Sequence, residues 1–85
     1  MLHKLQLEMS NSDDAEYEEL AIKAKSSYEN VSIDNVQDLL FPVTIGFPDR
    51  RCVELRPRSG VVGGTNVYCF AERSKRLIAH YQIME

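Results

Sequence analysis

The chain has 85 residues, of which 44% are hydrophobic and 27% are charged. This predicts a single small globular domain, residues 1–85, and excludes general disorder. The formal net charge of −3 opposes non-specific binding to nucleic acid. The apolar-rich stretch 39–48 is too short to span a membrane, and residues 1–9 lack the long apolar run of a secretory signal. We therefore expect a cytoplasmic protein that makes no membrane contact.

The N-terminal residues predict a short strand followed by the main helix. Leu5, Leu7 and Met9 alternate with polar residues, which is the period of a half-buried strand over residues 2–9. Residues 10–14 are rich in helix-capping side chains, and the helix is expected to run from there to about residue 28. Its apolar stripe has helical spacing and consists of Tyr17, Leu20, Ala21, Ala24 and Tyr28.

Residues 32–41 predict a short second helix, which Asp34 caps and Pro42 ends, because proline disfavours helical geometry in the residue before it. Four strands are predicted to follow in two hairpins. Residues 43–47 and 51–56 alternate and form the first hairpin. The second hairpin consists of residues 66–72 and residues 75–84.

The strands of the second hairpin are apolar on both faces. Val67, Cys69 and Ala71 point one way, and Tyr68 and Phe70 point the other. Such a pattern predicts central strands, or strands with one face on the helix and the other in a dimer contact. The predicted fold class is α+β in the order β-α-α-β-β-β-β. It is a mostly antiparallel sheet of four to five strands with one main amphipathic helix packed on one face.

The most site-like segment is the Arg/Gly-rich loop 56–66. Glycines let backbone amides approach an anion, and arginines bind phosphate or carboxylate through two hydrogen bonds. The loop matches neither a P-loop nor a dinucleotide fingerprint. The favoured interpretation is a structural turn, in which the glycine pair supplies a positive φ or a bulge. The alternative is an anion site, whose candidate residues are Arg56, Arg58, Ser59, Gly60, Gly63, Gly64 and Thr65.

Charge is distributed unevenly along the chain. Residues 1–49 carry ten acids and three lysines, whereas residues 50–85 carry seven basic and three acidic side chains. One interpretation is that the two halves pack together and balance each other's surface field, with the turn charges solvated. The other is a nucleic-acid surface, on which Tyr68, Phe70 and Tyr81 would stack bases. Its basic patch would consist of Arg50, Arg51, Arg73, Lys75 and Arg76.

The cysteines and histidines have the side-chain types of a zinc site or a catalytic thiol. His3, Cys52, Cys69 and His80 contain no closely spaced ligand pair, so we expect no metal. Counted from the second hairpin turn, Cys69 should lie opposite residue 79, and His80 would then point away from it. In the cytoplasm we expect both thiols to be reduced, although their spacing does not exclude a disulfide.

Three functions are compatible with these patterns. The first is a non-enzymatic binding or regulatory module without a cofactor, which contacts a protein partner or a second copy through its sheet or its Arg/Gly loop. The second is nucleic-acid or phosphate-ligand binding through the 56–66 loop and the hairpin arginines. The third is an enzyme that uses Cys52 or Cys69, for which the sequence contains no catalytic constellation.

Overall fold

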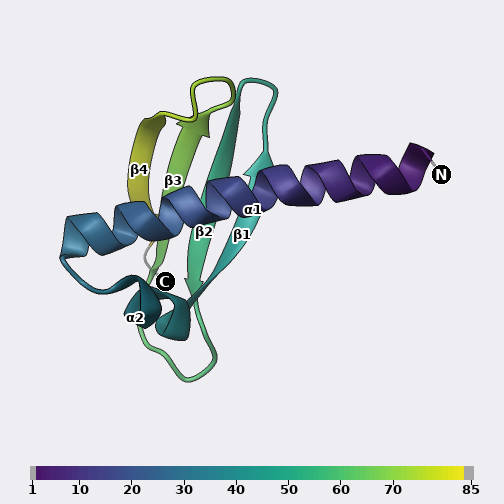
Figure 1. Ribbon diagram of the computed structural model, residues 1–85. Coiled ribbons are helices and arrows are strands. Elements are labelled where there is room, and N and C mark those ends of the chain that lie inside the picture. Colours follow the sequence, from purple (N-terminus) through teal and green to yellow (C-terminus); the bar gives the residue numbers. More distant parts are fainter. Residues whose placement is uncertain (1, 84–85) are drawn as a thin grey trace.

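The fold has two layers, with the helices on one face of a sheet (Figure 1). The structure, a computed structural model, describes the backbone of residues 2–83 and the side chains of residues 14–83. Its strands are antiparallel and lie in the order β1-β2-β3-β4. The predicted α+β class and the helix on one face are confirmed. The elements are α1 (Leu2–Glu29), α2 (Ile33–Leu39), β1 (Leu40–Gly46), β2 (Arg50–Pro57), β3 (Thr65–Ala71) and β4 (Leu77–Ile83).

The predicted N-terminal strand is wrong, because residues 2–9 belong to α1. The helix begins at Leu2, and residues 10–14, which were expected to cap it, lie inside it. The run is too short for its alternation to decide between the two structures, because Leu2, Leu5 and Met9 also have helical spacing. Leucine, lysine, glutamine, glutamate and methionine all favour helix over strand. Within residues 2–83, neither helix is both long and apolar enough to cross a membrane.

The apolar stripe of α1 packs on the sheet as predicted. Tyr17 and Ala21 are buried, whereas Tyr28 at the end of the stripe stays largely exposed. On the solvent side, Glu19 and Lys23 form an ion pair one helical turn apart, with 3.0 Å between nitrogen and oxygen. The spacing of apolar residues therefore predicts correctly which side of this part of α1 faces the sheet.

Helix α2 is shorter than predicted, because the chain enters β1 at Leu40. Ser32 caps the helix in place of Asp34, and its hydroxyl accepts a hydrogen bond of 3.1 Å from the Asn35 amide. Pro42 lies inside β1 rather than ahead of it. An edge strand tolerates this residue, since one side of its backbone has no partner in the sheet.

The main core lies between the helices and the sheet. On β2 and β3 every second side chain points into this core, because successive side chains of a strand point to opposite faces. Burial of a valine, leucine or phenylalanine of this kind contributes about 1.5–3 kcal/mol. The fully buried members of this core are Tyr17, Ala21, Val36, Val53, Leu55, Tyr68 and Phe70.

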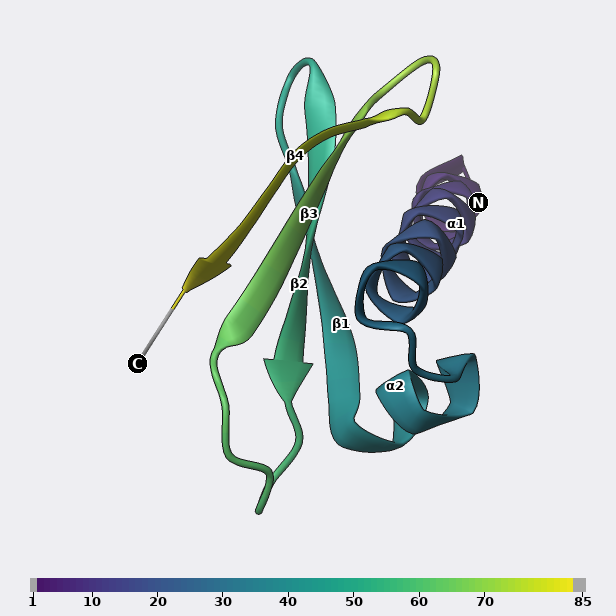
Figure 2. The same ribbon diagram turned by 90° about the vertical axis from the view of Figure 1, so that its left-hand side faces the viewer.

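The other face of the sheet has no helix on it among the described residues, and Figure 2 shows both helices on one side. Val67 and Cys69 lie on this side, and Tyr68 and Phe70 lie on the other, which confirms the predicted two-sided apolarity of β3. We call this surface the open face. From the strand register, its residues are Phe41, Val43, Ile45, Arg50, Cys52, Glu54, Arg56, Thr65, Val67, Cys69, Ala71, Ala79, Tyr81 and Ile83.

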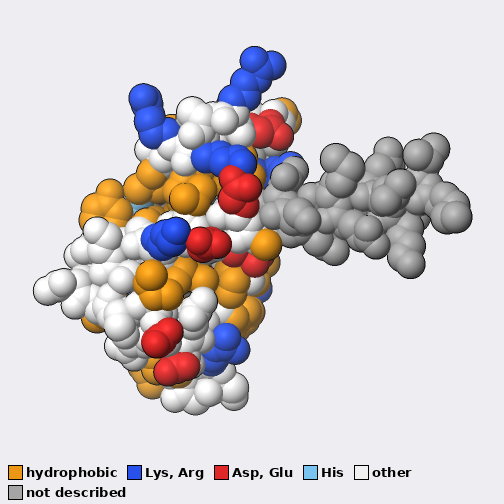
Figure 3. Space-filling model, viewed as in Figure 1, with side chains coloured by type: hydrophobic (Ala, Val, Ile, Leu, Met, Phe, Trp, Pro, Cys, Tyr) orange, Lys and Arg blue, Asp and Glu red, His pale blue; other side chains and the backbone are white. Residues whose placement is uncertain are grey.

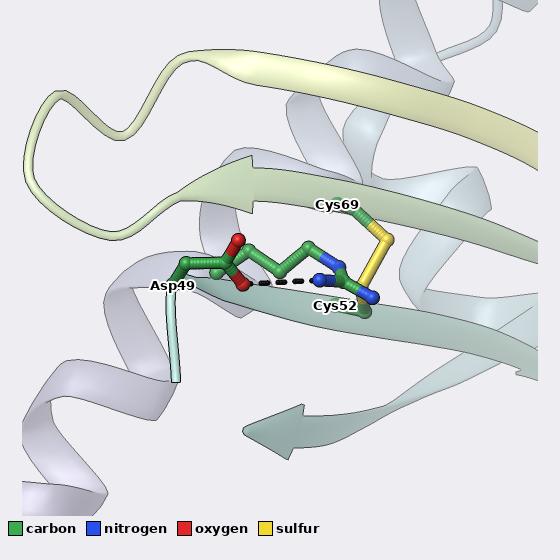
Figure 4. The surroundings of a disulfide bond; sticks show 4 residues. Asp49, Cys52 and Cys69 are labelled. Carbon is green, nitrogen blue, oxygen red and sulfur yellow. Dashed lines mark hydrogen bonds and ion pairs between the residues drawn. A yellow bond between two sulfur atoms is a disulfide. The ribbon is translucent and has the colours of Figure 1, made fainter. Parts of the chain in front are cut away.

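The prediction of two reduced thiols is wrong, because Cys52 and Cys69 form a disulfide across the open face (Figure 4). They are direct partners on β2 and β3, with their Cα atoms 4.0 Å apart. The distance between two cysteines along the chain does not reveal this pairing, but the strand register does. Disulfides are typical of oxidising compartments, so the cytoplasmic location remains a prediction that the disulfide does not support.

Reduction of the Cys52–Cys69 disulfide is expected to lower the free energy of unfolding. The two cysteines are separated by 17 positions, and a loop of that length corresponds to about 3 kcal/mol of chain entropy in the unfolded state. Urea unfolding with and without a phosphine reductant measures the difference. The double variant Cys52→Ala/Cys69→Ala is the control and should not respond to the reductant. Equal stability of the unmodified protein in both conditions would contradict the prediction.

Candidate functional site

The two predicted sites lie at opposite ends of the sheet. The β1–β2 and β3–β4 turns lie together at one end (Figure 1), where the Glu72 amide donates a hydrogen bond of 3.4 Å to the Asp49 carbonyl. The β2–β3 loop lies at the other end. A seven-residue strand spans roughly 23 Å, which is too far for one phosphate or nucleotide to contact both regions. The loop and the turn arginines are therefore two separate regions.

Acidic side chains of α1 pair with the basic turns. Arg51 donates to Asp14 at 3.0 Å, and its second terminal nitrogen lies 3.7 Å from the Glu72 carboxylate. Lys75 pairs with Glu16 on the same helix. These contacts join the acidic half of the chain to the basic half. They support the interpretation that the two halves balance each other's charge.

Of the remaining residues of the predicted basic patch, one is paired with an acidic side chain and two are exposed. Arg50 pairs with Asp49 at 3.0 Å, and its guanidinium lies 4.3 Å from the centre of the Phe47 ring. Arg73 and Arg76 are exposed at the second turn. Figure 3 shows acidic and basic side chains intermingled at this end of the molecule. A mixed surface of this kind attracts a polyanion less than a uniformly basic one would.

The aromatic residues expected to stack bases do not share a surface. Tyr68 and Phe70 are buried in the core on the helix side, whereas Tyr81 is 52% exposed on the open face. Stacking of bases requires rings that are exposed. The three residues therefore do not form a base-stacking platform.

Six of the seven loop residues predicted to bind an anion line one shallow hollow at the end of the sheet. Glu54, Phe41 and Ile83 also line this hollow, whereas Gly64 lies in a separate one of about 230 Å³ beside α2. Gly60 and Gly63 have φ values of +86° and +148°, so these two glycines serve the turn. The structural interpretation predicted a positive φ for the pair Gly63-Gly64, and it holds for Gly63. The six residues that the structure brings together are Arg56, Arg58, Ser59, Gly60, Gly63 and Thr65.

Both arginines of the loop are engaged within the chain. Arg56 donates from Nε and Nη2 to one carboxylate oxygen of Glu54, at 2.9 and 2.6 Å. Arg58 donates from Nε to the Gln37 carbonyl at 3.0 Å and so holds the loop to α2. An incoming anion would have to compete with the Glu54 carboxylate for Arg56. Anion binding by the loop therefore stays a prediction.

Tyr68 carries a buried polar group in the core. Its hydroxyl makes no hydrogen bond to the described residues, and its ring stacks on His80, with 4.3 Å between the ring centres. Burial, together with the nearby charges of Glu29 and Tyr28, raises the pKa of the hydroxyl to about 12. The group is therefore neutral at physiological pH and unsuited to act as a general base.

The cysteines and histidines do not form a catalytic or metal-binding cluster within the described side chains, residues 14–83. Cys69 lies opposite Ala79 and His80 lies opposite Tyr68, so the register predicted from the hairpin is confirmed. No three His, Cys, Asp or Glu side chains in this part of the chain lie close enough to hold a metal ion. The side chain of His3 lies outside the described residues.

The open face is the surface that sequence reasoning located only in part. The apolar pattern of β3 revealed it, but the prediction did not include Phe41, Val43 and Ile45 of β1 as part of the same surface. Their alternation was visible in the sequence. It did not show which face of β1 is opposite the helices, because that depends on the register with β2.

Comparisons of this chain with protein-family models, with curated proteins and with solved structures find no match. The geometry of the chain's own residues is therefore the guide to its function. Three features of that geometry bear on function. They are the turns, where basic side chains pair with α1, the loop 56–66, whose arginines donate hydrogen bonds within the chain, and the open face.

The Tyr68→Phe variant is expected to be as stable as the unmodified protein at neutral pH, or more stable, because the buried hydroxyl has no hydrogen bond to lose among the described residues. Above pH 10, Tyr68 ionises in the unfolded chain but stays neutral in the folded protein until about pH 12. The unmodified protein should therefore lose stability between pH 10 and 12 relative to the variant. Urea unfolding of both proteins at neutral and alkaline pH measures this, and an identical decline in both would disprove the raised pKa.

The Glu54→Gln variant is expected to bind phosphate more tightly than the unmodified protein, by up to about fivefold, because an exposed ion pair is worth roughly 0.2–1 kcal/mol and its loss frees Arg56. Titration with phosphate, followed by the amide NMR shifts of residues 56–66, measures the affinity. The double variant Glu54→Gln/Arg56→Gln should lose the gain. Unchanged shifts in all three proteins would rule out an anion site in the loop.

Proposed function

We propose that the chain is a non-enzymatic docking module that binds another protein through the open face of its sheet. The observation that carries the proposal is the absence of a second layer over this face within residues 2–83, although all four strands place apolar side chains on it. Phe41, Tyr81 and Ile83 are each more than a third exposed. Exposed large apolar side chains that share one face of a sheet are typical of protein–protein contacts.

The centre of the open face is already covered and rigid, so a partner would contact the exposed side chains around it, Phe41, Tyr81 and Ile83. Cys52, Val67 and Cys69 form a buried apolar cluster there, and the disulfide joins the two central strands beneath any partner. A surface held in one shape loses little conformational freedom when it binds. We therefore expect docking without rearrangement of the sheet.

The charges on the open face define the chemistry of the partner. Glu54 lies among apolar side chains, and its carboxylate is satisfied by Arg56 on the same strand. Because the two charges compensate each other, the pair favours a partner that is apolar at the centre and polar or neutral where it meets Arg56. An acidic or basic partner surface would leave its own charge unpaired against the apolar strands.

The non-enzymatic part of the proposal is supported by the state of the reactive groups. The thiols of Cys52 and Cys69 are joined to each other, and the Tyr68 hydroxyl is buried and neutral. Each of these arrangements removes a nucleophile or base from use. The proposed docking needs no cofactor.

Anion binding by the 56–66 loop is the second candidate function. The hollow that six of its residues share favours anion binding. Two features weigh against it: both arginines already donate hydrogen bonds within the chain, and the loop is separated from the basic turns. A single phosphate group would fit this arrangement better than a nucleic acid. The titration of the Glu54→Gln variant tests it independently of docking.

The Val43→Lys variant is expected to lose the protein partner while staying folded, because Val43 lies half-buried on the open face and outside the main core. Tagged protein is used to capture partners from cells, and quantitative mass spectrometry compares the variants. Proteins that dock on the open face should fall about tenfold with Val43→Lys, as expected for an unpaired charge costing at least 1.4 kcal/mol at an interface.

The matched control is Glu19→Lys, which changes an exposed residue of α1 on the far side of the molecule. It should keep every partner that Val43→Lys loses. Circular dichroism checks that both variants fold. Docking through the open face is rejected if each captured protein binds the two variants equally.

A further inference from the structure

We infer that β4 is a dimerisation edge: two copies of the chain pair antiparallel through β4 and extend the sheet to eight strands. The two-fold axis of such a pair is perpendicular to the sheet, so both open faces lie on the same side. The paired sheets present one larger docking surface, so the inference deepens the proposed function. The role given to the dimer rests on that proposed function.

The outer edge of β4 lacks the features that usually prevent strand pairing. Edge strands are normally protected by charged side chains, by proline or by a covering element. Strand β4 contains no charged residue and no proline, and six of its seven residues are exposed. The other edge strand, β1, contains Pro42 and contacts both helices. Of the two edges, β4 is therefore the one suited to pair with a second copy.

The sequence of β4 is complementary to itself in one register. A bulge interrupts its pairing with β3 near Leu77, and the ladder is regular from Ala79 to Ile83. A two-fold axis through Tyr81, the centre of this stretch, places the two Tyr81 rings opposite each other. On the open face, Ala79 then lies opposite Ile83 of the second copy, so a small side chain meets a large one.

The same register is also favourable on the helix side, where His80 lies opposite Gln82 of the second copy and can exchange a hydrogen bond with it. No like charges meet in any of these pairs, and a cross-strand aromatic pair contributes about 0.2–1 kcal/mol relative to alanine. These features favour a second copy over an unrelated strand, because one sequence supplies both sides of each pair.

The size of the open face also supports a second copy of the chain as the partner of β4. With strands about 4.8 Å apart and a rise of about 3.3 Å per residue, four strands of about seven residues cover roughly 440 Å² in projection. A standard protein interface buries about 800 Å² on each partner. Pairing of two copies through β4 doubles the area of the face and so brings it closer to the size of a standard interface.

Cysteine cross-linking tests the register. Tyr81→Cys places two cysteines directly opposite each other at the two-fold axis, and non-reducing electrophoresis should show a dimer about tenfold more abundant than for a cysteine that is not at the interface. Val43→Cys is the matched control, because residue 43 lies on the same face but on the far edge strand β1. Mass spectrometry confirms that residue 81 links to residue 81, and that Cys52 and Cys69 stay joined.

A dimer for Tyr81→Cys alone supports the inference. A dimer for Val43→Cys alone, for both variants or for neither overturns it. The unmodified chain gives a second measurement by light scattering: its mass should rise from 9.7 kDa toward twice that value with concentration. Amide hydrogen exchange in residues 79–83 should slow over the same range, because the paired edge protects backbone amides. Exchange that stays unchanged as the mass rises would overturn pairing through β4.

Failure of the dimer and failure of docking are distinguishable. Val43→Lys should lose the captured protein but still dimerise, because residue 43 is three strands away from β4. If the chain stays monomeric and Val43→Lys still loses its partner, docking stands and the β4 inference is wrong. If the chain dimerises and the partner binds Val43→Lys unchanged, docking is wrong and the edge contact stands.

Discussion

Packing of α1 against β2 and β3 is the contact on which the other features depend. Tyr17 and Ala21 are buried in it, and the Tyr17 hydroxyl donates to the Glu72 carbonyl at 2.8 Å, which fixes the helix to the β3–β4 turn. This position brings Asp14 and Glu16 to the basic turns. It also covers one face of the sheet and leaves the other open. Charge balance at the turns and exposure of the apolar face therefore have the same origin.

A sheet covered on one side has a thin core, and the disulfide lies where the second layer is absent. In a small domain a cross-link compensates for limited apolar burial. Cys52 and Cys69 join the two central strands on the open face itself. The cross-link stabilises the fold without covering that face, which keeps Val43, Ile45 and Tyr81 available for contact.

The charges on the open face are compensated within the chain, because Arg50 pairs with Asp49 and Glu54 pairs with Arg56. At the turns, Arg51 and Lys75 pair with acidic residues of α1. Compensated charges give little long-range attraction for a polyanion, whereas an apolar surface gains from any partner that removes it from water. Apolar burial therefore favours protein docking over nucleic-acid binding. The edge of the same sheet, β4, is the proposed contact with a second copy of the chain.

Local periodicity by itself determined much of the fold. The stripe of Tyr17 and Ala21, the four alternating strands and the register of Cys69 opposite residue 79 follow from patterns within a few residues of each other. The pattern failed at residues 2–9, because a short run of leucines fits both periods. The disulfide, the pairing of Arg51 with Asp14 and of Arg56 with Glu54, and the exposure of one sheet face were decided only by the tertiary structure. They depend on which residues distant in sequence become neighbours and on which side of the sheet the helix packs.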